Sequence, residues 1–223
     1  MSILTGRIVS LLIGYVFGLF QTGYIYGKVM ERLDIRNYGS GNAGSTNVLR
    51  VLGKKAAFIV LLGDVFKAVF AMLICSWLFR ETGNASLFAM YAALGVTLGH
   101  DFPFYLGFKG GKGIASMAGI MSVMDLRMTL VCFILFVSIV FLTRYVSLGS
   151  ILVSITFCAM NAYFCLLGTY QAERQFYPEI IGIAAFLMIL AVWQHRANIG
   201  RLLAGNENKI GSKTVRKAEE KTE

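Results

Sequence analysis

The segment from residue 37 to residue 50, NYGSGNAGSTNVLR, has the composition of an anion-binding loop. Glycine permits positive φ angles and close approach of a ligand, and successive backbone N–H groups form a nest for anions. Ser45 or Thr46 could cap a following helix, whose N-terminus would add partial positive charge. An ordinary glycine-rich turn between helices is the alternative. We call residues 37–50 the glycine loop, and its candidate phosphate ligands are Ser40, Gly41, Asn42, Gly44, Thr46, Asn47 and Arg50.

A second polar segment, GHDFPFYLGFKGGKGIA at residues 99–115, places two lysines and three glycines directly before an apolar stretch. Ammonium groups and backbone donors at a helix N-terminus suit a phosphate or a carboxylate. The segment is not a nucleotide P-loop, because Leu106 occupies the first glycine position and Gly113 replaces the residue that holds magnesium. Lysines that merely follow the charge bias of membrane loops are the alternative. We call residues 99–115 the lysine loop, with candidate ligands His100, Lys109, Gly110, Gly111, Lys112 and Gly113.

A third polar segment, WQHRANIGRLLAGNENKI at residues 193–210, carries side chains at helical spacing. His195, Asn198 and Arg201 are three residues apart, which predicts one face of a helix leaving the membrane. Contacts of the arginines with lipid headgroups and an interfacial role for His195 are the alternatives. The chain has two histidines, and each lies in a separate polar segment. This coincidence favours a shared site. We call residues 193–210 the C-terminal segment.

Two charged residues, Asp64 and Lys67, interrupt an otherwise apolar stretch and lie on one helical face. Charges at membrane depth are costly and usually pair in the protein interior. A structural ion pair, a transport relay and support for the site all remain open from the spacing alone. The four cysteines lie in apolar stretches and form no Cys/His cluster, so neither a metal nor a disulfide framework is expected.

The elements that must position these residues are membrane helices. Of 223 residues, 57% are hydrophobic and 15% are charged, with a mean hydropathy of +0.66, which argues against a soluble globule. Seven apolar blocks cover residues 8–26, 56–79, 87–99, 114–124, 128–143, 147–170 and 180–194. The blocks 87–99 and 114–124 are shorter than a normal span, so they are either short spans or arms of a re-entrant hairpin. Either number of crossings, seven or five, places the termini on opposite faces.

The distribution of basic residues predicts the orientation. The net charge of +9 comes from basic residues between apolar blocks, which favours an anionic bilayer surface and phosphate-bearing substrates over nucleic acid. With the C-terminus in the cytoplasm, 16 Lys and Arg residues lie inside and 4 lie outside. The positive-inside rule therefore predicts an outside N-terminus, a cytoplasmic C-terminus and all three polar segments on the cytoplasmic side.

The three segments GSGNAGSTN, GHDFPFYLGFKGGKG and HRANIGRLLAGNE resemble, in order and spacing, the signature motifs of the PlsY family of acyl-phosphate:glycerol-3-phosphate acyltransferases. The resemblance implies an all-α protein with seven transmembrane helices in the bacterial plasma membrane. It also implies one membrane-embedded acyltransferase domain over residues 1–210, followed by a charged cytoplasmic tail over residues 211–223. None of the departures from the family pattern, such as Ala43 and Ala197, removes a group expected to contact phosphate.

The implied reaction transfers a fatty acyl group from acyl phosphate to the sn-1 hydroxyl of glycerol 3-phosphate, an early step of phospholipid synthesis. It gives lysophosphatidic acid and phosphate, needs no cofactor, and suggests a functional link to the enzyme that makes acyl phosphate. The HxxxxD pattern of acyltransferases that use thioesters is absent, since Tyr105 and Gly200 occupy the fifth positions after the two histidines. We assign catalytic roles to Ser40, Lys112, His195 and Asn198, and substrate binding to the other candidate ligands of both loops, Arg201 and Glu207.

For His195 two roles stay open, a general base or a residue that positions substrate. Two other functions are weighed against acyl transfer. A transporter for a phosphorylated metabolite would use Asp64 and Lys67 as a relay, but the sequence shows no internal repeat of the kind many transporters have. A scaffold in lipid synthesis would leave the three polar segments without a purpose.

Overall fold

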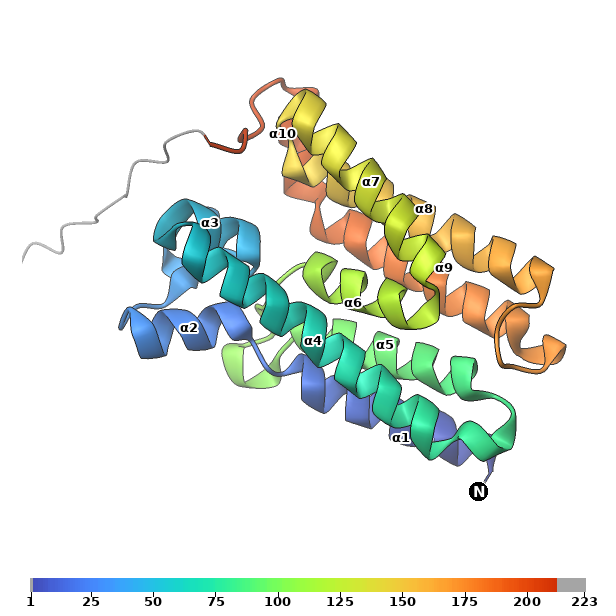
Figure 1. Cartoon of the computed structure of the whole chain (residues 1–223). Helices are drawn as coiled ribbons and strands as arrows, with labels where there is room; N and C mark the ends of the chain where they lie inside the picture. Colours follow the sequence, from blue (N-terminus) through green and yellow to red (C-terminus); the bar gives the residue numbers. More distant parts are fainter. Residues whose placement is uncertain (1, 212–223) are drawn as a thin grey trace, which may run out of the picture.

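The computed structural model describes residues 2–211, which form a bundle of α-helices joined by short turns and two longer loops (Figure 1). In chain order the helices are α1 (Ile3–Gly18), α2 (Thr22–Met30), α3 (Ser45–Leu52), α4 (Lys54–Leu78), α5 (Ala85–Asp101), α6 (Ile114–Met124), α7 (Leu126–Thr143), α8 (Val146–Leu167), α9 (Tyr177–Gln194) and α10 (Arg196–Leu203). The tail predicted over residues 211–223 lies outside the described residues, apart from Gly211.

Five stretches of the described chain are long and apolar enough to cross a membrane: Ile3–Met30, Lys54–Leu78, Leu126–Thr143, Val146–Leu167 and Arg174–Gln194. Their outer faces carry large apolar side chains; on α7, for example, Phe141 is 82% exposed. Such side chains need lipid around them. The two short blocks of the sequence correspond to α5, with 17 residues, and α6, with 11 residues. At 1.5 Å per residue α6 is only about 16 Å long, about half of a hydrocarbon core.

The packing core is α5, which is buried along almost all of its length. Glycines four residues apart on α1 and α5 let the two backbones touch. A Cβ atom on Gly14 would lie 2.1 Å from the carbonyl oxygen of Ala92, and one on Gly95 would lie 2.2 Å from that of Leu11. Gly18 and Gly99 repeat this contact one turn further along. Small residues at this spacing are the usual solution for close helix packing in membranes.

The apolar block at residues 8–26, expected as one span, is divided by a break at residues 19–21 between α1 and α2. Polar groups at the break form hydrogen bonds with the neighbouring helices and within the break itself. The Lys67 ammonium donates to the Phe20 carbonyl at 2.7 Å, and the buried Gln21 amide donates to the carbonyls of Gly18 and His100 at 3.2 and 2.9 Å. Irregular backbone at membrane depth is tolerated when protein satisfies it in this way.

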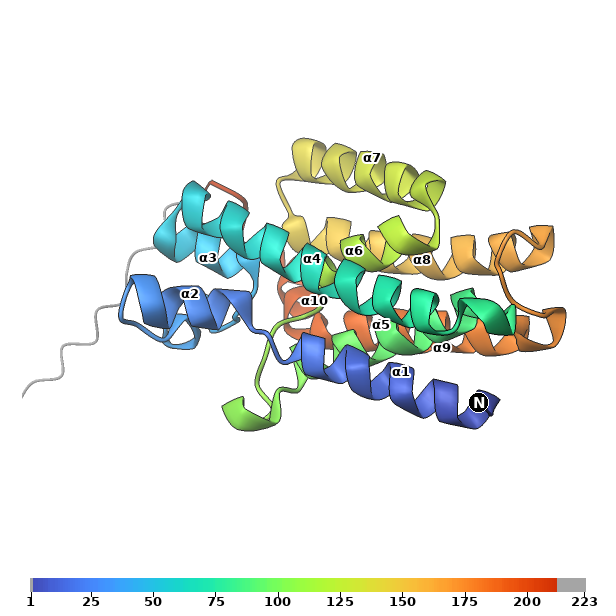
Figure 2. The ribbon, with the colours of Figure 1, turned by 60° about the horizontal axis from the view of Figure 1, so that its bottom comes forward.

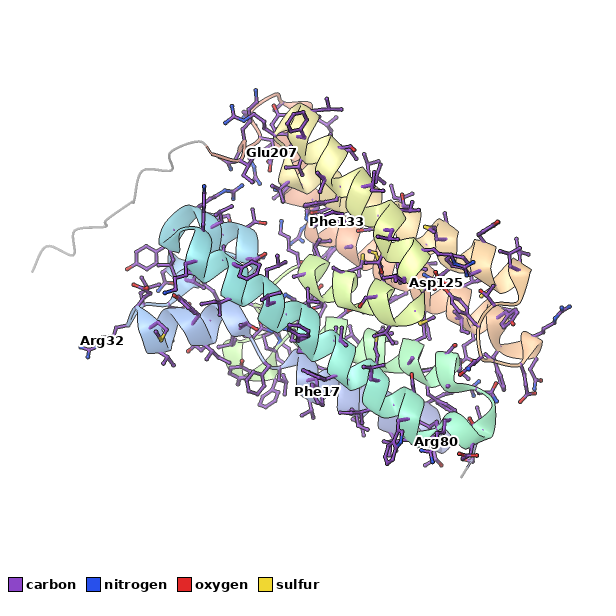
Figure 3. All side chains as sticks on the ribbon, in the orientation of Figure 1. Phe17, Arg32, Arg80, Asp125, Phe133 and Glu207 are labelled. Carbon is purple, nitrogen blue, oxygen red and sulfur yellow. The ribbon has the colours of Figure 1, made fainter. Side chains whose placement is uncertain are left out.

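The three polar segments lie at one end of the helix bundle. Figure 2 shows the N-terminus at one end and α2 and α3 at the other. Figure 3 places Arg80 at the N-terminal end, whereas Arg32 and Glu207 lie at the far end. The glycine loop, the lysine loop and the C-terminal segment thus gather at the end away from the N-terminus, as the sequence requires for a single site.

Candidate functional site

The glycine loop is held in shape by the side chain of Asn47. Its Oδ1 accepts a hydrogen bond from the backbone N–H of Ser40 at 2.8 Å. Its Nδ2 donates to the carbonyls of Tyr38 at 3.0 Å, Asn42 at 2.9 Å and Ile35 at 3.2 Å. Asn47 is 2% exposed, and its amide binds backbone groups of the loop and of Ile35, which lies just before it. Its role in this structure is to fix the loop rather than to face a substrate.

The backbone of the glycine loop explains the glycines. Gly39 and Gly41 adopt φ angles of +60° and +74°, which other residues rarely adopt. The prediction that Ser45 or Thr46 caps the following helix is wrong. Helix α3 begins at Ser45, its N-cap is Gly44, and no side chain caps it. The N–H of Gly44 is instead bonded to Oδ1 of Asn42 at 2.9 Å, because the tight turn brings that amide onto the cap residue.

The lysine loop folds back onto the C-terminal end of α5. The N–H groups of Gly110 and Gly111 donate to the carbonyls of Asp101 at 3.1 Å and His100 at 3.0 Å. Gly113 has a φ angle of +71° and directs the chain into α6. His100 is only 2% exposed. The loop thereby carries Lys112 toward the C-terminal segment, while Lys109 stays exposed.

The C-terminal segment is not one continuous helix. Helix α9 ends at Gln194, His195 is its C-cap, and Asn198 and Arg201 belong to α10. The expectation that all three side chains share one helix face is therefore corrected. The physical reason is a local change of direction after α9, where the His195 N–H bonds to the carbonyls of both Ala191 and Val192.

The carboxylate of Glu207, which is 7% exposed, connects α8 with α10 and, through Asn198, with the lysine loop. Its Oε1 accepts hydrogen bonds from Asn198 Nδ2 at 2.7 Å and from Ser147 Oγ at 3.0 Å. Its Oε2 accepts from Arg201 Nε at 2.7 Å. Because the Asn198 amide nitrogen is turned to Glu207, its oxygen Oδ1 accepts a hydrogen bond from the Lys112 ammonium. The lysine loop and the C-terminal segment thus meet through one ordered chain of hydrogen bonds.

The site carries more positive than negative charge. Burial lowers the pKa of the Lys112 ammonium to about 8, with Arg201 and Arg50 adding to the effect. Burial also lowers the pKa of Arg50; the positive charge of Arg201 lowers this pKa further, and the negative charge of Glu207 partly offsets the shift. Burial would raise the pKa of the Glu207 carboxyl, but hydrogen bonds from Asn198, Arg201 and Ser147 hold it below its ordinary value. Three cations from three segments therefore face one carboxylate, which leaves a surplus for an anion.

His195 is neutral and has a defined tautomer. Burial lowers its pKa to about 4, and the charge of Lys112 lowers it further. Its Nδ1 lies 2.7 Å from the carbonyl oxygen of Ala191. Since a carbonyl can only accept, Nδ1 carries the hydrogen and Nε2 keeps a lone pair. His195 can therefore accept a hydrogen bond, or a proton, through Nε2.

The structure brings together some predicted site residues and leaves others apart. Lys112, Asn198, Arg201 and Glu207 form one hydrogen-bonded cluster, and Arg50 interacts with it through its charge alone. Among residues 2–211, no hydrogen bond or ion pair joins the side chain of Lys109 or the hydroxyl of Ser40 to that cluster. Ser147 was missed by the sequence analysis, because a serine within an apolar helix gives no signal of its contact with Glu207. Within the described chain no group of His, Cys, Asp and Glu residues is placed to hold a metal ion.

Comparison with known proteins decides the family. The family model described as Glycerol-3-phosphate acyltransferase matches residues 8–205. The glycerol-3-phosphate acyltransferase of Thermoanaerobacter sp. (strain X514) is 44% identical over 207 residues, which cover 93% of this chain and 97% of the relative. The chain belongs to the glycerol-3-phosphate acyltransferase family. A further member, from Clostridioides difficile (strain 630), is 42% identical over 92% of this chain and 96% of its own.

Solved structures of this acyltransferase family give the same answer. The glycerol 3-phosphate form of PlsY, an integral membrane glycerol 3-phosphate acyltransferase, has a TM-score of 0.78 at 32% identity and covers 92% of this chain and 96% of its own. The lysophosphatidic acid form of PlsY has a TM-score of 0.76 at the same identity. The resemblance seen in the three polar segments is thereby confirmed. The protein is an integral membrane acyltransferase of phospholipid synthesis.

Proposed function

We propose that this acyltransferase moves a fatty acyl group from acyl phosphate to the sn-1 hydroxyl of glycerol 3-phosphate, releasing lysophosphatidic acid and phosphate. The observation that carries the proposal is that Arg201 binds the single carboxylate of Glu207 directly and Lys112 is joined to it through Asn198, while the charge of Arg50 acts at the same place. Both substrates bring a phosphate group to the reaction. Surplus positive charge at one end of an apolar bundle suits two anionic headgroups, one of which carries an acyl tail that can lie in lipid.

Lys112 is the group that stabilises developing charge. An ammonium has three N–H donors, and one of them is bonded to Asn198. The remaining two can contact the carbonyl oxygen of the acyl group and a phosphate oxygen. A donor fixed in advance and aimed at the oxyanion contributes about 3–4 kcal/mol to such reactions. Asn198, in turn held by Glu207, sets the direction of the ammonium.

The bond changes follow from these positions. The sn-1 oxygen attacks the acyl carbonyl carbon, the bond between that carbon and the phosphate oxygen breaks, and inorganic phosphate leaves. The hydroxyl proton passes to the departing phosphate. Nε2 of His195 accepts a hydrogen bond from the attacking hydroxyl and so orients it. We assign His195 to positioning rather than to proton removal, because its buried imidazole, with a pKa of about 4, is a weak base. An oxygen of the phosphate group leaving the acyl carbon is the stronger base and takes the proton.

The glycine loop contributes the second anion site in this proposal. On a backbone fixed by Asn47, Ser40 and Thr46 supply hydroxyl donors, Gly41 lets a phosphate approach the backbone closely, and Arg50 supplies charge. From the lysine loop, Lys109 supplies charge. Gly110 and Gly111, whose N–H groups are bonded to Asp101 and His100, and Gly113 allow a phosphate to approach the backbone closely. Magnesium and other cofactors have no assigned part in the reaction.

The donor is tested by assaying the purified protein with radiolabelled glycerol 3-phosphate and one of three donors: acyl phosphate, acyl-CoA or acyl carrier protein. Lysophosphatidic acid should form from acyl phosphate and in traces at most from the thioesters. Treatment of the product with phospholipase A1, which hydrolyses the sn-1 ester, should then release the fatty acid and return radiolabelled glycerol 3-phosphate. Efficient turnover of acyl-CoA would overturn the donor assignment but leave the acyltransferase family unchanged.

The membrane placement belongs to the same proposal. We place the protein in the bacterial plasma membrane with seven crossings, with α5 and α6 as short spans of the single domain at residues 1–210. The N-terminus is outside and the site faces the cytoplasm, where the enzyme that makes acyl phosphate can deliver its product. Reporter fusions after Met1 and after Glu223 should report outside and cytoplasm, respectively. A cytoplasmic N-terminus would contradict the 16-to-4 distribution of basic residues.

A further inference from the structure

The buried pair in α4 has a third member on α5. Lys67 Nζ lies 2.8 Å from Asp64 Oδ1, as expected for a pair at this spacing, and 2.7 Å from Nδ1 of His100. It also donates to the carbonyl of Phe20 at 2.7 Å. Asp64, Lys67 and His100 are 1%, 5% and 2% exposed. The three N–H donors of the ammonium have three acceptors, so Lys67 has no donor left for a transported solute.

The contact with Lys67 fixes the state of His100. An ammonium only donates, so Nδ1 of His100 must carry a lone pair, and in the neutral ring the hydrogen is on Nε2. Protonation of Nδ1 would place two cationic N–H groups 2.7 Å apart. The tautomer of His100 is thus opposite to that of His195, whose Nδ1 donates to a carbonyl.

The other edge of the His100 ring supports the lysine loop. A Cβ atom on Gly111 would lie 1.9 Å from His100 Nε2, and one on Gly110 would lie 2.0 Å from the His100 carbonyl oxygen. That carbonyl also accepts hydrogen bonds from the Gly111 N–H at 3.0 Å and from Gln21 Nε2 at 2.9 Å. The ring and backbone of His100 are therefore in contact with the two glycines that immediately precede Lys112.

We infer that Asp64 and Lys67 are positioning residues for acyl transfer, which fix the ring and tautomer of His100 and thereby hold the lysine loop where Lys112 reaches Asn198. The chain of contacts runs from α4 through His100 and Gly111 to the ammonium at the site. This inference rests on the acyltransferase activity and not on the identity of the acyl donor. It selects one of the three roles that the sequence left open for the pair.

The first test observes the tautomer directly. The chain has two histidines, so protein labelled with 15N-histidine gives two imidazole rings, and a His195→Gln sample identifies the signals of His100. In the wild-type protein the two rings should show opposite tautomers. In Lys67→Met the His100 ring should lose its single Nε2–H form, while the His195 ring stays unchanged. An unchanged His100 ring in Lys67→Met would overturn the inference.

The second test separates positioning from mere stability. The double variant Asp64→Asn/Lys67→Met removes both charges, so no unpaired charge is left buried. In folded, monodisperse protein we expect kcat to fall about 10- to 100-fold, as for a small displacement of a catalytic group, with a smaller change in the KM for glycerol 3-phosphate. Wild-type kcat in this variant would refute the role. The assay uses whichever acyl donor the wild-type protein turns over best.

Two further variants keep the test decisive. Gly111→Ala leaves the buried charges intact but places a methyl group against His100 Nε2, and it should lower kcat to a similar extent; full activity would count against the inference. Arg7→Met is the matched control, because it removes an ion pair with Glu179 elsewhere in the bundle. This control should keep the wild-type kcat and both histidine tautomers.

Discussion

The charge on Lys112 makes the reaction sensitive to alkaline pH. Burial and the neighbouring arginines lower its pKa to about 8. The charged form exists below the pKa, so activity that needs the ammonium is lost as the pH rises. About 90% of Lys112 is protonated at pH 7 and about 10% at pH 9, so kcat/KM, which reports the free enzyme, should fall about tenfold between these values.

The pKa of Lys112 should differ between the pH profile of kcat/KM and that of kcat. A bound phosphate dianion attracts the ammonium and raises its pKa, so the alkaline limb of kcat should lie at higher pH than that of kcat/KM. The assay measures initial rates of lysophosphatidic acid formation from pH 6.5 to 9.5 at saturating and limiting glycerol 3-phosphate. The second ionisation of the substrate phosphate is complete near pH 7 and adds no slope above pH 8.

Lys112→Arg is the control that identifies the titrating group. An arginine keeps its charge throughout this pH range, so the alkaline limb should disappear even though the larger guanidinium lowers the absolute rate. An alkaline limb that persists near pH 8 in Lys112→Arg, or a flat profile in the wild-type enzyme, would refute the assignment of the charge to Lys112.

Three other changes test the supporting structure. Asn47→Leu removes the amide that accepts from Ser40 and donates to the carbonyls of Ile35, Tyr38 and Asn42. At about 1 kcal/mol per hydrogen bond it should cost roughly 2–3 kcal/mol of stability and at least tenfold in kcat/KM; a melting curve and activity equal to wild type would contradict the fixed loop. His195→Gln, which keeps an acceptor near Nε2, should stay within about tenfold of wild-type kcat, whereas His195→Ala should lose about 10²-fold or more; equal losses in both would make His195 the base. Gly95→Ala brings a Cβ to 2.2 Å from the Leu11 carbonyl and should lower the melting temperature through overpacking of about 1–3 kcal/mol, while Gly182→Ala, with open space around it, should leave it unchanged.

Much of the architecture could be predicted from local signals. The short block at residues 114–124 coincides with α6, because lipid or protein surroundings require apolar side chains along the whole helix. The ion pair of Asp64 and Lys67 could be predicted from their spacing of three residues and the cost of isolated charge in an apolar stretch. The break after α1 could not, since the polar residues Gln21 and Thr22 do not by themselves end a helix in an apolar block. The Phe20 carbonyl in the break accepts a hydrogen bond from Lys67, which lies on another helix.

The sequence by itself determined which residues carry the chemistry and on which kind of scaffold. Composition established the membrane helices, and three polar segments with glycine, lysine and histidine indicated phosphate chemistry and the family. Only the tertiary structure decided which of these residues meet. Lys112 and Asn198 are 86 residues apart, and Glu207 binds Ser147 of α8, which is 60 residues away. Such contacts depend on how whole helices pack, with glycines setting the distances between backbones, and no local pattern of side chains encodes that geometry.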